Sequence, residues 1–284
     1  MTAALVALGA AVATAVADGV GPATVEQQAV RVDPPRPALL VSDSAWLGIK
    51  TYGAIDAVQG FSHVFDLASC RRRVSPSCTN YDDHTPITLA DEMRGYGVRF
   101  HTLIVATGYN DGATRFRSDV DTILGLARTY GYERVVWLTL RSNVAYQSPG
   151  DLGFAAVFEE NNATIREIVA SGDHPELVIA DWATYARERP EWFAPDGIHL
   201  RMAGPWAAAD YISRKLAALD GRPCPQPLTP GRAVADPCPD PDGSPPLADI
   251  EALYPVYEPG NPTDGFFMEW EGSSSWPAPA WWTS

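Results

Sequence analysis

The chain has 284 residues, of which 46% are hydrophobic and 20% charged, the proportions of a globular protein that buries a core rather than of a disordered or fibrous one. Its formal net charge of -14 repels phosphate backbones and anionic lipid surfaces, which argues against binding to nucleic acids or membrane surfaces. We therefore expect one catalytic-sized domain with appendages and no nucleic-acid partner.

The first residues form an apolar, alanine-rich segment that predicts export. Residues 2–17 end in Ala-Val-Ala, the small-x-small pattern that signal peptidases accept. The segment is short for a membrane span and lacks a basic flank at its start, so a buried helix and the end of a longer anchor remain alternatives. We interpret residues 1–17 as a signal peptide or anchor remnant, residues 18–35 as a linker, and the protein as extracellular or bound at the cell surface.

Further along, runs rich in Val, Leu and Ile alternate with segments whose apolar residues recur every three or four positions. The runs are typical of parallel strands buried on both faces, and the periodic segments are typical of amphipathic helices. The predicted fold class is therefore α/β, a three-layer α/β/α sandwich around a five-stranded parallel sheet. The expected strands are residues 38–41, 63–67, 100–106, 134–140 and 177–181. The expected helices are residues 89–96, a segment with Ser118 as its N-cap, residues 154–169, and a last helix from Met202 or Ala203 to about Gly221.

Beyond this last helix the chain changes character. Pro, Gly and acidic residues interrupt residues 222–284 every few positions and no apolar period is sustained, which predicts an irregular extension. Its aromatic residues are numerous for a solvated linker, so the extension either packs on the domain or contacts glycans, the cell wall or another partner. The globular domain is thus expected over residues 36–221. The aromatic residues of the extension include Phe266, Phe267, Trp270, Trp276, Trp281 and Trp282.

The four cysteines fall into two local pairs, Cys70 with Cys78 and Cys224 with Cys238. Each pair closes a short loop, and neither has the C-x-x-C spacing of a zinc site. Four cysteines allow three pairings, and reduced thiols are an alternative. Two local disulfides, formed in an oxidising compartment, are the interpretation that we favour.

Polar residues follow several of the expected strands at the point where each strand ends. Ser44 follows the first strand and Asn110 the third, while Asp196 and His199 lie three residues apart after the fifth. Because the carboxyl ends of parallel strands meet at one edge of a sheet, we expect these side chains to converge. They supply an acyl-transfer site with Ser44 as nucleophile, His199 as general base and Asp196 to orient the base. Asn110 and the backbone N–H groups of Ser44 and Cys70 are the expected oxyanion donors.

Each of these residues also has a structural role as an alternative. Ser44 could cap the helix that follows the first strand, and Ser42 is a competing nucleophile that we discount because it lies one step inside the strand. Asp196 could cap a turn, and His199 could be a packed ring. Asn110 could make an Asx turn. The presence of all of them in one order along the chain favours the catalytic interpretation.

Two further polar clusters carry weaker hypotheses. Residues 82–84, Asp-Asp-His, could bind a divalent metal ion, but adjacent carboxylates in a loop are more often solvated, and we expect neither a metal nor a cofactor. Residues 71–73, three arginines, form the only basic run. This run could bind an anionic group of a substrate or could simply be exposed to solvent.

In their order along the chain these motifs resemble the sequence blocks of the SGNH hydrolases, also called GDSL-like esterases. The resemblance extends over most of residues 36–221 and implies a flavodoxin-like fold, the triad named above, and supporting roles for Asp43 and Gly108. The matching residues are Asp43-Ser44 for the family's Gly-Asp-Ser, Gly108-Tyr109-Asn110 for its Gly-x-Asn, and Asp196-Gly197-Ile198-His199 for its Asp-x-x-His.

The chain departs from the family pattern at two positions. Ser42 replaces the glycine of the first block, and Cys70 or Ser69 stands where the second block has its glycine. Neither departure changes the triad, although the second concerns an oxyanion donor. With Cys70-Arg71 after the second strand, the chain looks most like extracytoplasmic SGNH domains related to cell-surface O-acyltransferases, which act on acyl groups of glycans.

The resemblance implies a secreted serine esterase or acylhydrolase that removes acetyl or other short acyl groups from an acylated carbohydrate or a small ester. Two alternatives stay open: an O-acyltransferase that uses the same acyl-Ser44 intermediate, and a non-catalytic glycan-binding module built on the same fold. A glycosidase is less favoured, because no pair of carboxylates stands out after the strands.

Overall fold

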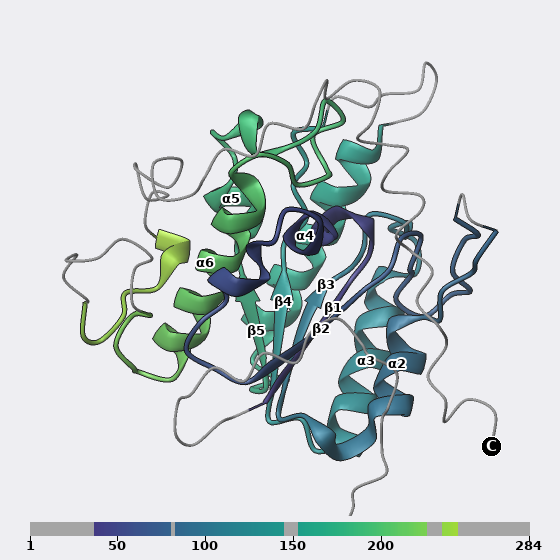
Figure 1. Ribbon diagram of the computed structural model, residues 1–284. Helices are drawn as coiled ribbons and strands as arrows, with labels where there is room; N and C mark the ends of the chain where they lie inside the picture. The colour runs from purple at the N-terminus through teal and green to yellow at the C-terminus, as the bar shows by residue number, and fades with distance from the viewer. Residues whose placement is uncertain (1–36, 81–82, 145–152, 226–234, 244–284) are drawn as a thin grey trace, which may run out of the picture. The chain divides into compact units, whose positions relative to one another are not determined.

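The computed structural model describes residues 37–80, 83–144, 153–225 and 235–243 (Figure 1). The expected signal segment, the linker, Asp82 and the Trp-rich end of the chain lie outside the described residues, so the hypotheses about them stay predictions. Among the described residues no helix has the length and apolar character needed to cross a bilayer.

The five apolar runs form one parallel sheet. Its strands are β1 (Ala38–Ser42), β2 (His63–Leu67), β3 (Thr102–Ala106), β4 (Arg134–Leu138) and β5 (Leu177–Ala180), in the order β2-β1-β3-β4-β5. Every residue of β1 and β3 is buried, because other elements cover both faces of the sheet. Burial on two sides explains why these strands are continuous apolar runs, and it confirms the predicted five-stranded parallel sheet.

Helices lie on both sides of this sheet (Figure 1). Those of the described residues are α1 (Gly48–Thr51), α2 (Leu89–Tyr96), α3 (Phe116–Thr129), α4 (Phe154–Ser171), α5 (Trp182–Tyr185) and α6 (Gly204–Leu219). Along β1, Leu40 packs in the cluster with α1, α5 and α6, whereas Leu39 and Val41 pack in the cluster with α2, α3 and the later part of α4. Alternate residues thus face opposite layers, as the pleat of a strand requires. The three-layer α/β/α architecture predicted from the sequence is confirmed.

The helices differ from the predicted ones mainly at their ends. Helix α3 begins at Phe116 with Arg115 at the N-cap position, so the prediction of Ser118 as N-cap is wrong. The Ser118 hydroxyl instead donates to the Arg115 carbonyl oxygen at 2.8 Å. Helices α1 and α5 have only four residues each, too few for a periodic pattern to reveal them.

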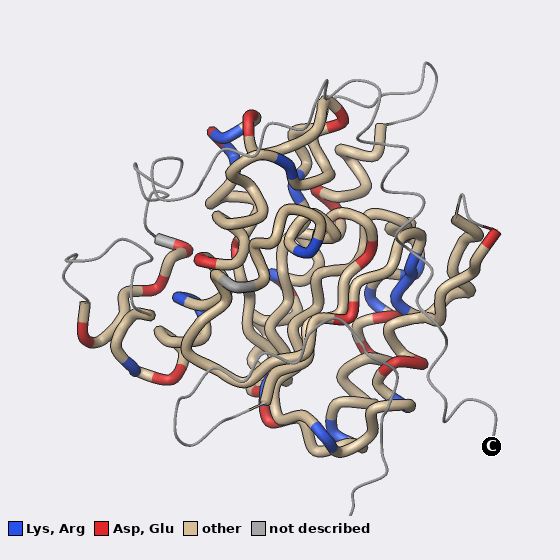
Figure 2. Tube along the Cα trace, viewed as in Figure 1, with Lys and Arg blue, Asp and Glu red and all other residues tan. Residues whose placement is uncertain are grey.

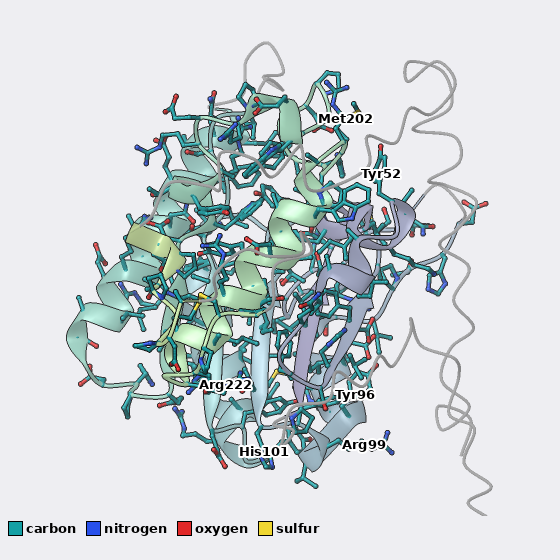
Figure 3. The ribbon with its side chains drawn as sticks, turned by 60° about the vertical axis from the view of Figure 1, so that its left-hand side comes forward. Tyr52, Tyr96, Arg99, His101, Met202 and Arg222 are labelled. Carbon is teal, nitrogen blue, oxygen red and sulfur yellow. A yellow bond between two sulfur atoms is a disulfide. The ribbon has the colours of Figure 1, made fainter. Side chains whose placement is uncertain are left out.

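The strand order reverses at β1, which has β2 on one side and β3 on the other. Ser42, the last residue of β1, lies in register with Leu67 of β2 and Ala106 of β3. The segments after these three strands therefore leave the sheet side by side at its carboxyl edge. In open α/β sheets this reversal is where ligands bind. Figure 3 shows Met202 at this end of the sheet and Arg99 at the opposite end.

Two disulfides are present, Cys70–Cys78 and Cys224–Cys238. Both pairings match those predicted from the sequence, so that prediction is confirmed. The first closes the loop after β2, next to the reversal point, and the second joins the chain after α6 to the described part of the C-terminal extension.

Residues 235–243 of that extension pack on α6. The buried Lys215 pairs with Asp240 and Asp242 at 2.9 and 2.6 Å, and the Tyr211 hydroxyl donates to Asp242 at 2.5 Å. Two acidic residues of the extension thus neutralise a buried lysine. Figure 2 shows acidic residues at many other places along the trace, in loops as well as in helices.

Candidate active site

Ser44 lies in the first turn after β1, at the reversal point of the sheet. It opens a short 3-10 turn that Asp43 caps by accepting a hydrogen bond from the Ala45 N–H at 3.0 Å. The capping role considered for Ser44 therefore belongs to Asp43. Ser42, the competing hydroxyl, is fully buried and donates to the carbonyl oxygen of the last residue of β3 at 3.1 Å, so a substrate does not reach it.

The segment from Asp196 to His199 folds against the turn after β1. An antiparallel bridge between Phe193 and Leu200 closes the loop that contains it, and the Leu200 N–H donates to the Ala45 carbonyl oxygen at 3.1 Å. Gly48 permits this approach, because a Cβ there would lie 2.5 Å from the Leu200 carbonyl oxygen. Residues separated by 155 positions in the sequence are thus brought together.

His199 lies between Ser44 and Asp196. Its Nε2 is 3.0 Å from Ser44 Oγ, and its Nδ1 is 2.5 Å from Asp196 Oδ2. The other carboxylate oxygen, Oδ1, accepts from the N–H groups of Ile198 and His199 at 2.8 and 3.1 Å, so the turn role considered for Asp196 coexists with the contact to the imidazole. The structure therefore brings the three predicted residues together at distances that allow proton transfer.

The surroundings keep Asp196 ionised. Burial by itself raises the pKa of this carboxyl, but the hydrogen bond and charge of His199 and two backbone N–H donors outweigh it, and the pKa lies below its usual value of 3.8. A carboxylate beside Nδ1 favours the tautomer with the proton on that nitrogen, which leaves Nε2 as an acceptor for the Ser44 hydroxyl. A general base needs this arrangement of protons.

The three predicted oxyanion donors follow neighbouring strand ends. Within the described residues the backbone N–H groups of Ser44 and Cys70 donate no hydrogen bond to another backbone group. The Asn110 side chain donates to the Arg71 carbonyl oxygen at 3.2 Å rather than to its own turn, and its amide has a second N–H to offer. Their role toward an oxyanion stays a prediction.

Cys70 has a backbone conformation that few residues with a side chain adopt. Its φ of 70° lies in the left-handed region, which favours glycine because glycine has no Cβ. Cys70, and not Ser69, therefore has the backbone shape expected of the missing glycine. The disulfide to Cys78, and the hydrogen bond from the Cys78 N–H to the Cys70 carbonyl oxygen at 3.2 Å, hold it there.

The basic run after β2 is mostly internal. Arg71 is 2% exposed, and its Nη2 donates to two carboxylates, one from β2 and one from α2, at 2.8 and 2.9 Å. Arg73 is 0% exposed, with its Nε 3.7 Å from Asp111 and 3.5 Å from Asp119. The hypothesis that this run binds an anion of the substrate therefore does not hold for Arg71 and Arg73. Arg72 alone of the three is partly exposed.

Arg141 belongs to the site although no sequence pattern singles it out. Its backbone N–H donates to the Tyr109 hydroxyl at 2.8 Å. Its guanidinium lies over the Phe193 ring and donates through Nη1 to the Gly197 carbonyl oxygen at 2.8 Å. Arg141 thus links the segment after β3 to the loop that carries His199. Its one sequence signal is its place just after a strand that ends at the site.

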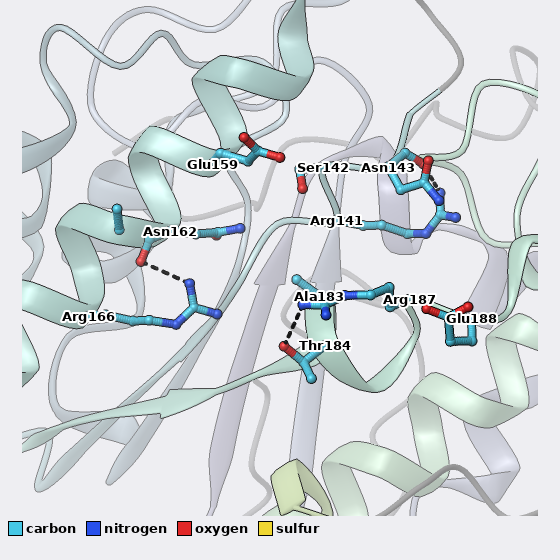
Figure 4. Close-up of a pocket in the computed structure, with 11 residues that line it drawn as sticks. Arg141, Ser142, Asn143, Glu159, Asn162, Arg166, Ala183, Thr184, Arg187 and Glu188 are labelled. Atoms are coloured by element: carbon cyan, nitrogen blue, oxygen red, sulfur yellow. Dashed lines mark hydrogen bonds between the residues drawn. The ribbon is translucent and has the colours of Figure 1, made fainter.

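Arg141 also lines a hollow between α4 and α5. Figure 4 shows this hollow, which has a volume of about 630 Å³. Arginines, glutamates, amides and hydroxyls are mixed in its walls, so its charge does not select one class of ligand.

No metal centre is found among the described residues, since no group of three or more His, Cys, Asp or Glu side chains there is placed to hold an ion. Of the predicted acidic cluster, Asp83 and His84 are described and exposed, and Asp82 is not described. The expectation that the protein needs no metal stays a prediction.

Asp43 fixes the serine turn relative to the segment after β3. Its Oδ1 accepts from the Ala45 N–H at 3.0 Å, and its Oδ2 accepts from the Gly108 and Tyr109 N–H groups at 2.9 and 3.0 Å. Burial raises the pKa of this carboxyl, while these donors and the charge of His199 oppose the shift. All three hydrogen bonds require Asp43 to act as an acceptor.

We expect the Asp43→Asn variant to be less stable and less active. An amide nitrogen accepts no hydrogen bond, so at least one buried backbone N–H loses its partner, which costs about 1–3 kcal/mol of the free energy of unfolding. Urea denaturation and kcat for a chromogenic ester measure the two effects. The control is Asp121→Asn, an exposed carboxylate on α3, and equal stability of the two variants would contradict the role given to Asp43.

The chain matches no protein-family profile and no curated protein sequence. Several solved structures are similar to it. The catalytic domain of a peptidoglycan O-acetyltransferase from Streptococcus pneumoniae is 20% identical, and the match covers 62% of this chain and 87% of that domain with a TM-score of 0.44. A carbohydrate acetylesterase from Sinorhizobium meliloti is 16% identical, and the match covers 65% of this chain and 99% of that protein with a TM-score of 0.46. A lipolytic G-D-S-L family protein from Veillonella parvula is 13% identical, and the match covers 62% of this chain and 94% of that protein with a TM-score of 0.45.

Proposed function

We propose that the protein is an SGNH-type serine ester hydrolase, with Ser44 as nucleophile, His199 as general base and Asp196 as the residue that orients the base. The observation that carries this proposal is the series of contacts from the Asp196 carboxylate through the imidazole to the Ser44 hydroxyl, at 2.5 and 3.0 Å. Its position supports the proposal as well, because the contacts lie where the strand order reverses.

In the proposed reaction His199 Nε2 takes the proton of Ser44 Oγ while that oxygen attacks the carbonyl carbon of an ester. The oxyanion that forms accepts hydrogen bonds from the Ser44 and Cys70 N–H groups and from the Asn110 amide. The alcohol then leaves with the proton from His199, and the acyl group stays on Ser44. Water, deprotonated by His199, then attacks this acyl group, the bond to Ser44 Oγ breaks, and Ser44 takes the proton back from His199 as the acid leaves.

For the substrate we propose short acyl esters, acetyl above all, on a carbohydrate. The support for the carbohydrate is the resemblance of Cys70-Arg71 after β2 to SGNH domains that act on glycans. The two disulfides support export to an oxidising compartment. An acyltransferase would form the same acyl-Ser44 and pass the group to a sugar hydroxyl instead of water, so product analysis with a glycan acceptor distinguishes the two.

A panel of 4-nitrophenyl esters from acetate to laurate tests the proposed function. We expect turnover of the short esters and a fall for the long ones, in keeping with the short acyl group proposed above. A fluorophosphonate should stop the turnover and leave one adduct, located by mass spectrometry on the peptide with Ser44. A protein that neither turns over an ester nor takes the adduct would be a binding module.

A further inference from the structure

We propose that a small hollow beside Asn110 binds a carboxylate of the substrate and so selects acidic esters over neutral ones. This inference rests on the proposed function, because it places the carboxylate next to the ester that Ser44 attacks. The hollow has a volume of about 260 Å³, which suits a carboxylate and part of the group that bears it. Its cations are Arg72, in the loop after β2, and Arg115, at the start of α3.

The protein compensates these two cations only at longer range, through the charge of Asp111 on Arg72 and that of Asp119 on Arg115. Neither Arg72 nor Arg115 pairs with a carboxylate within 4.0 Å in the described ranges. Arg72 donates through Nη1 to the Pro76 carbonyl oxygen at 3.3 Å, and its Nε is buried without a partner. Arg72 as a whole is partly exposed, so its terminal N–H groups can donate to a carboxylate in the hollow.

Two carboxylates also border the hollow, but both are paired inside the protein. Asp111 and Asp119 lie 3.7 and 3.5 Å from Nε of the fully buried Arg73. Burial raises the pKa of both carboxyls, while the charge of Arg73 opposes the shift. Because like charges at short range repel, these two acids make a doubly charged phosphate a poorer occupant than a singly charged carboxylate.

Local contacts fix this hollow relative to the serine turn. Asn110 borders the hollow and is also the predicted oxyanion donor, and the Asp43 carboxylate binds the two backbone N–H groups just before it. On the other wall the Arg72 N–H donates to Ser77 Oγ at 3.2 Å, inside the loop that the Cys70–Cys78 disulfide closes. An anion held by Arg72 therefore lies on the Asn110 side of the reacting ester.

A matched pair of acetylated sugars tests the proposal. The 3-O-acetyl esters of methyl glucoside and methyl glucuronide differ at one carbon only, which carries a hydroxymethyl group in the glucoside and a carboxylate in the glucuronide. For the wild type we expect kcat/KM to be about tenfold higher for the glucuronide, the effect of one hydrogen bond between charged groups. Arg72→Gln and Arg115→Gln should each reduce this ratio towards one, and Arg72→Lys should retain most of it. Arg99→Gln, at the opposite end of the sheet (Figure 3), removes the same charge and should leave the ratio unchanged.

A second pair of esters shows which part of the substrate bears the carboxylate. The 4-nitrophenyl esters of succinate and butyrate differ by a terminal carboxylate on the acyl group. The background rate of each ester, measured with Ser44→Ala, is subtracted. A preference for succinate that depends on Arg72 places the anion on the acyl side, and a preference for the glucuronide places it on the sugar; either supports the proposal. Equal rates within both pairs, unchanged in Arg72→Gln, would overturn it. Partial unfolding lowers both members of a pair alike, so the ratio reports recognition alone.

Direct binding separates this proposal from the proposed function. Methyl glucuronide without an acyl group, titrated into Ser44→Ala and followed by NMR, should bind, and adding Arg72→Gln should abolish the binding. If no ester is turned over but this Arg72-dependent binding is found, the esterase is refuted and the carboxylate site stands. If esters are turned over but the glucuronide does not bind and the ratios are one, the carboxylate site is refuted and the esterase stands.

Discussion

Replacement of Ser44 by alanine should lower kcat for short acyl esters by at least about 10⁴-fold, roughly 5 kcal/mol of transition-state free energy, while the protein stays folded. Ser44 Oγ lies 3.0 Å from His199 Nε2, and without this oxygen no acyl-enzyme forms. What remains should come from the oxyanion donors and from binding of the ester. Turnover of 4-nitrophenyl acetate, measured beside thermal denaturation followed by circular dichroism, tests both parts of the expectation.

Ser42→Ala is the matched control, two residues earlier in the chain. Its hydroxyl is buried and donates to the carbonyl oxygens of Asp43 and Ala106, each of which keeps a second lone pair. We expect activity within a few fold of the wild type and a loss of about 1 kcal/mol in the free energy of unfolding. An active Ser44→Ala protein, or a Ser42→Ala protein that is inactive although folded, would show that the nucleophile is misassigned.

The sheet can be predicted from the sequence because the physics behind it is visible in short stretches. Strands β1 and β3 are covered on both faces, and burial on both faces leaves a continuous apolar run. The apolar spacing around residues 89–96 predicts helix α2. In the structure the Thr88 side chain accepts from the Asp91 N–H at its start, and Gly97, with φ of 59°, follows its end. The start of α3 is missed because Ser118 looks like a cap, whereas Arg115, which capping preferences do not favour, occupies the position.

The meeting of Ser44, Asp196 and His199 follows from the same logic, because strand ends converge at one edge. The burial of Arg71 and Arg73 does not follow from the convergence of strand ends. A run of charges normally predicts solvent exposure, yet Arg71 and Arg73 are buried because their partners lie on elements that come later in the chain. A single sequence does not reveal such partners.

Buried charged residues join the loops of the site to one another. Arg71 donates to the Ser42 and Asp66 carbonyl oxygens, which links the ends of β1 and β2. Asp43 links the ends of β1 and β3, and Arg141 links the segment after β3 to the loop with His199. Because a buried charge that loses its partner is strongly unfavourable, each link stabilises both of the loops that it joins.

The Asp196→Asn variant should keep its fold and lose about 10⁴-fold in kcat. The asparagine amide can donate to His199 Nδ1, which turns that nitrogen into an acceptor and moves the ring proton to Nε2. A protonated Nε2 cannot accept the Ser44 proton, so the nucleophile loses its base. The measurement is kcat for short esters at about pH 6 to 9, the range in which a general base changes its protonation. The control is Asp173→Asn, which changes an exposed carboxylate.

The pH dependence of stability examines the same contact without relying on activity. Folding lowers the pKa of Asp196 from its usual value of 3.8, so the ionised carboxylate contributes stability that is present above about pH 5 and is lost as the pH falls through the lowered pKa. The advantage of the wild type over Asp196→Asn in the free energy of unfolding should therefore shrink on acidification. An advantage that grows towards low pH would show that folding does not lower the pKa of Asp196. Full activity of the variant would show that Asp196 acts only as the cap of its turn and that another group orients the imidazole.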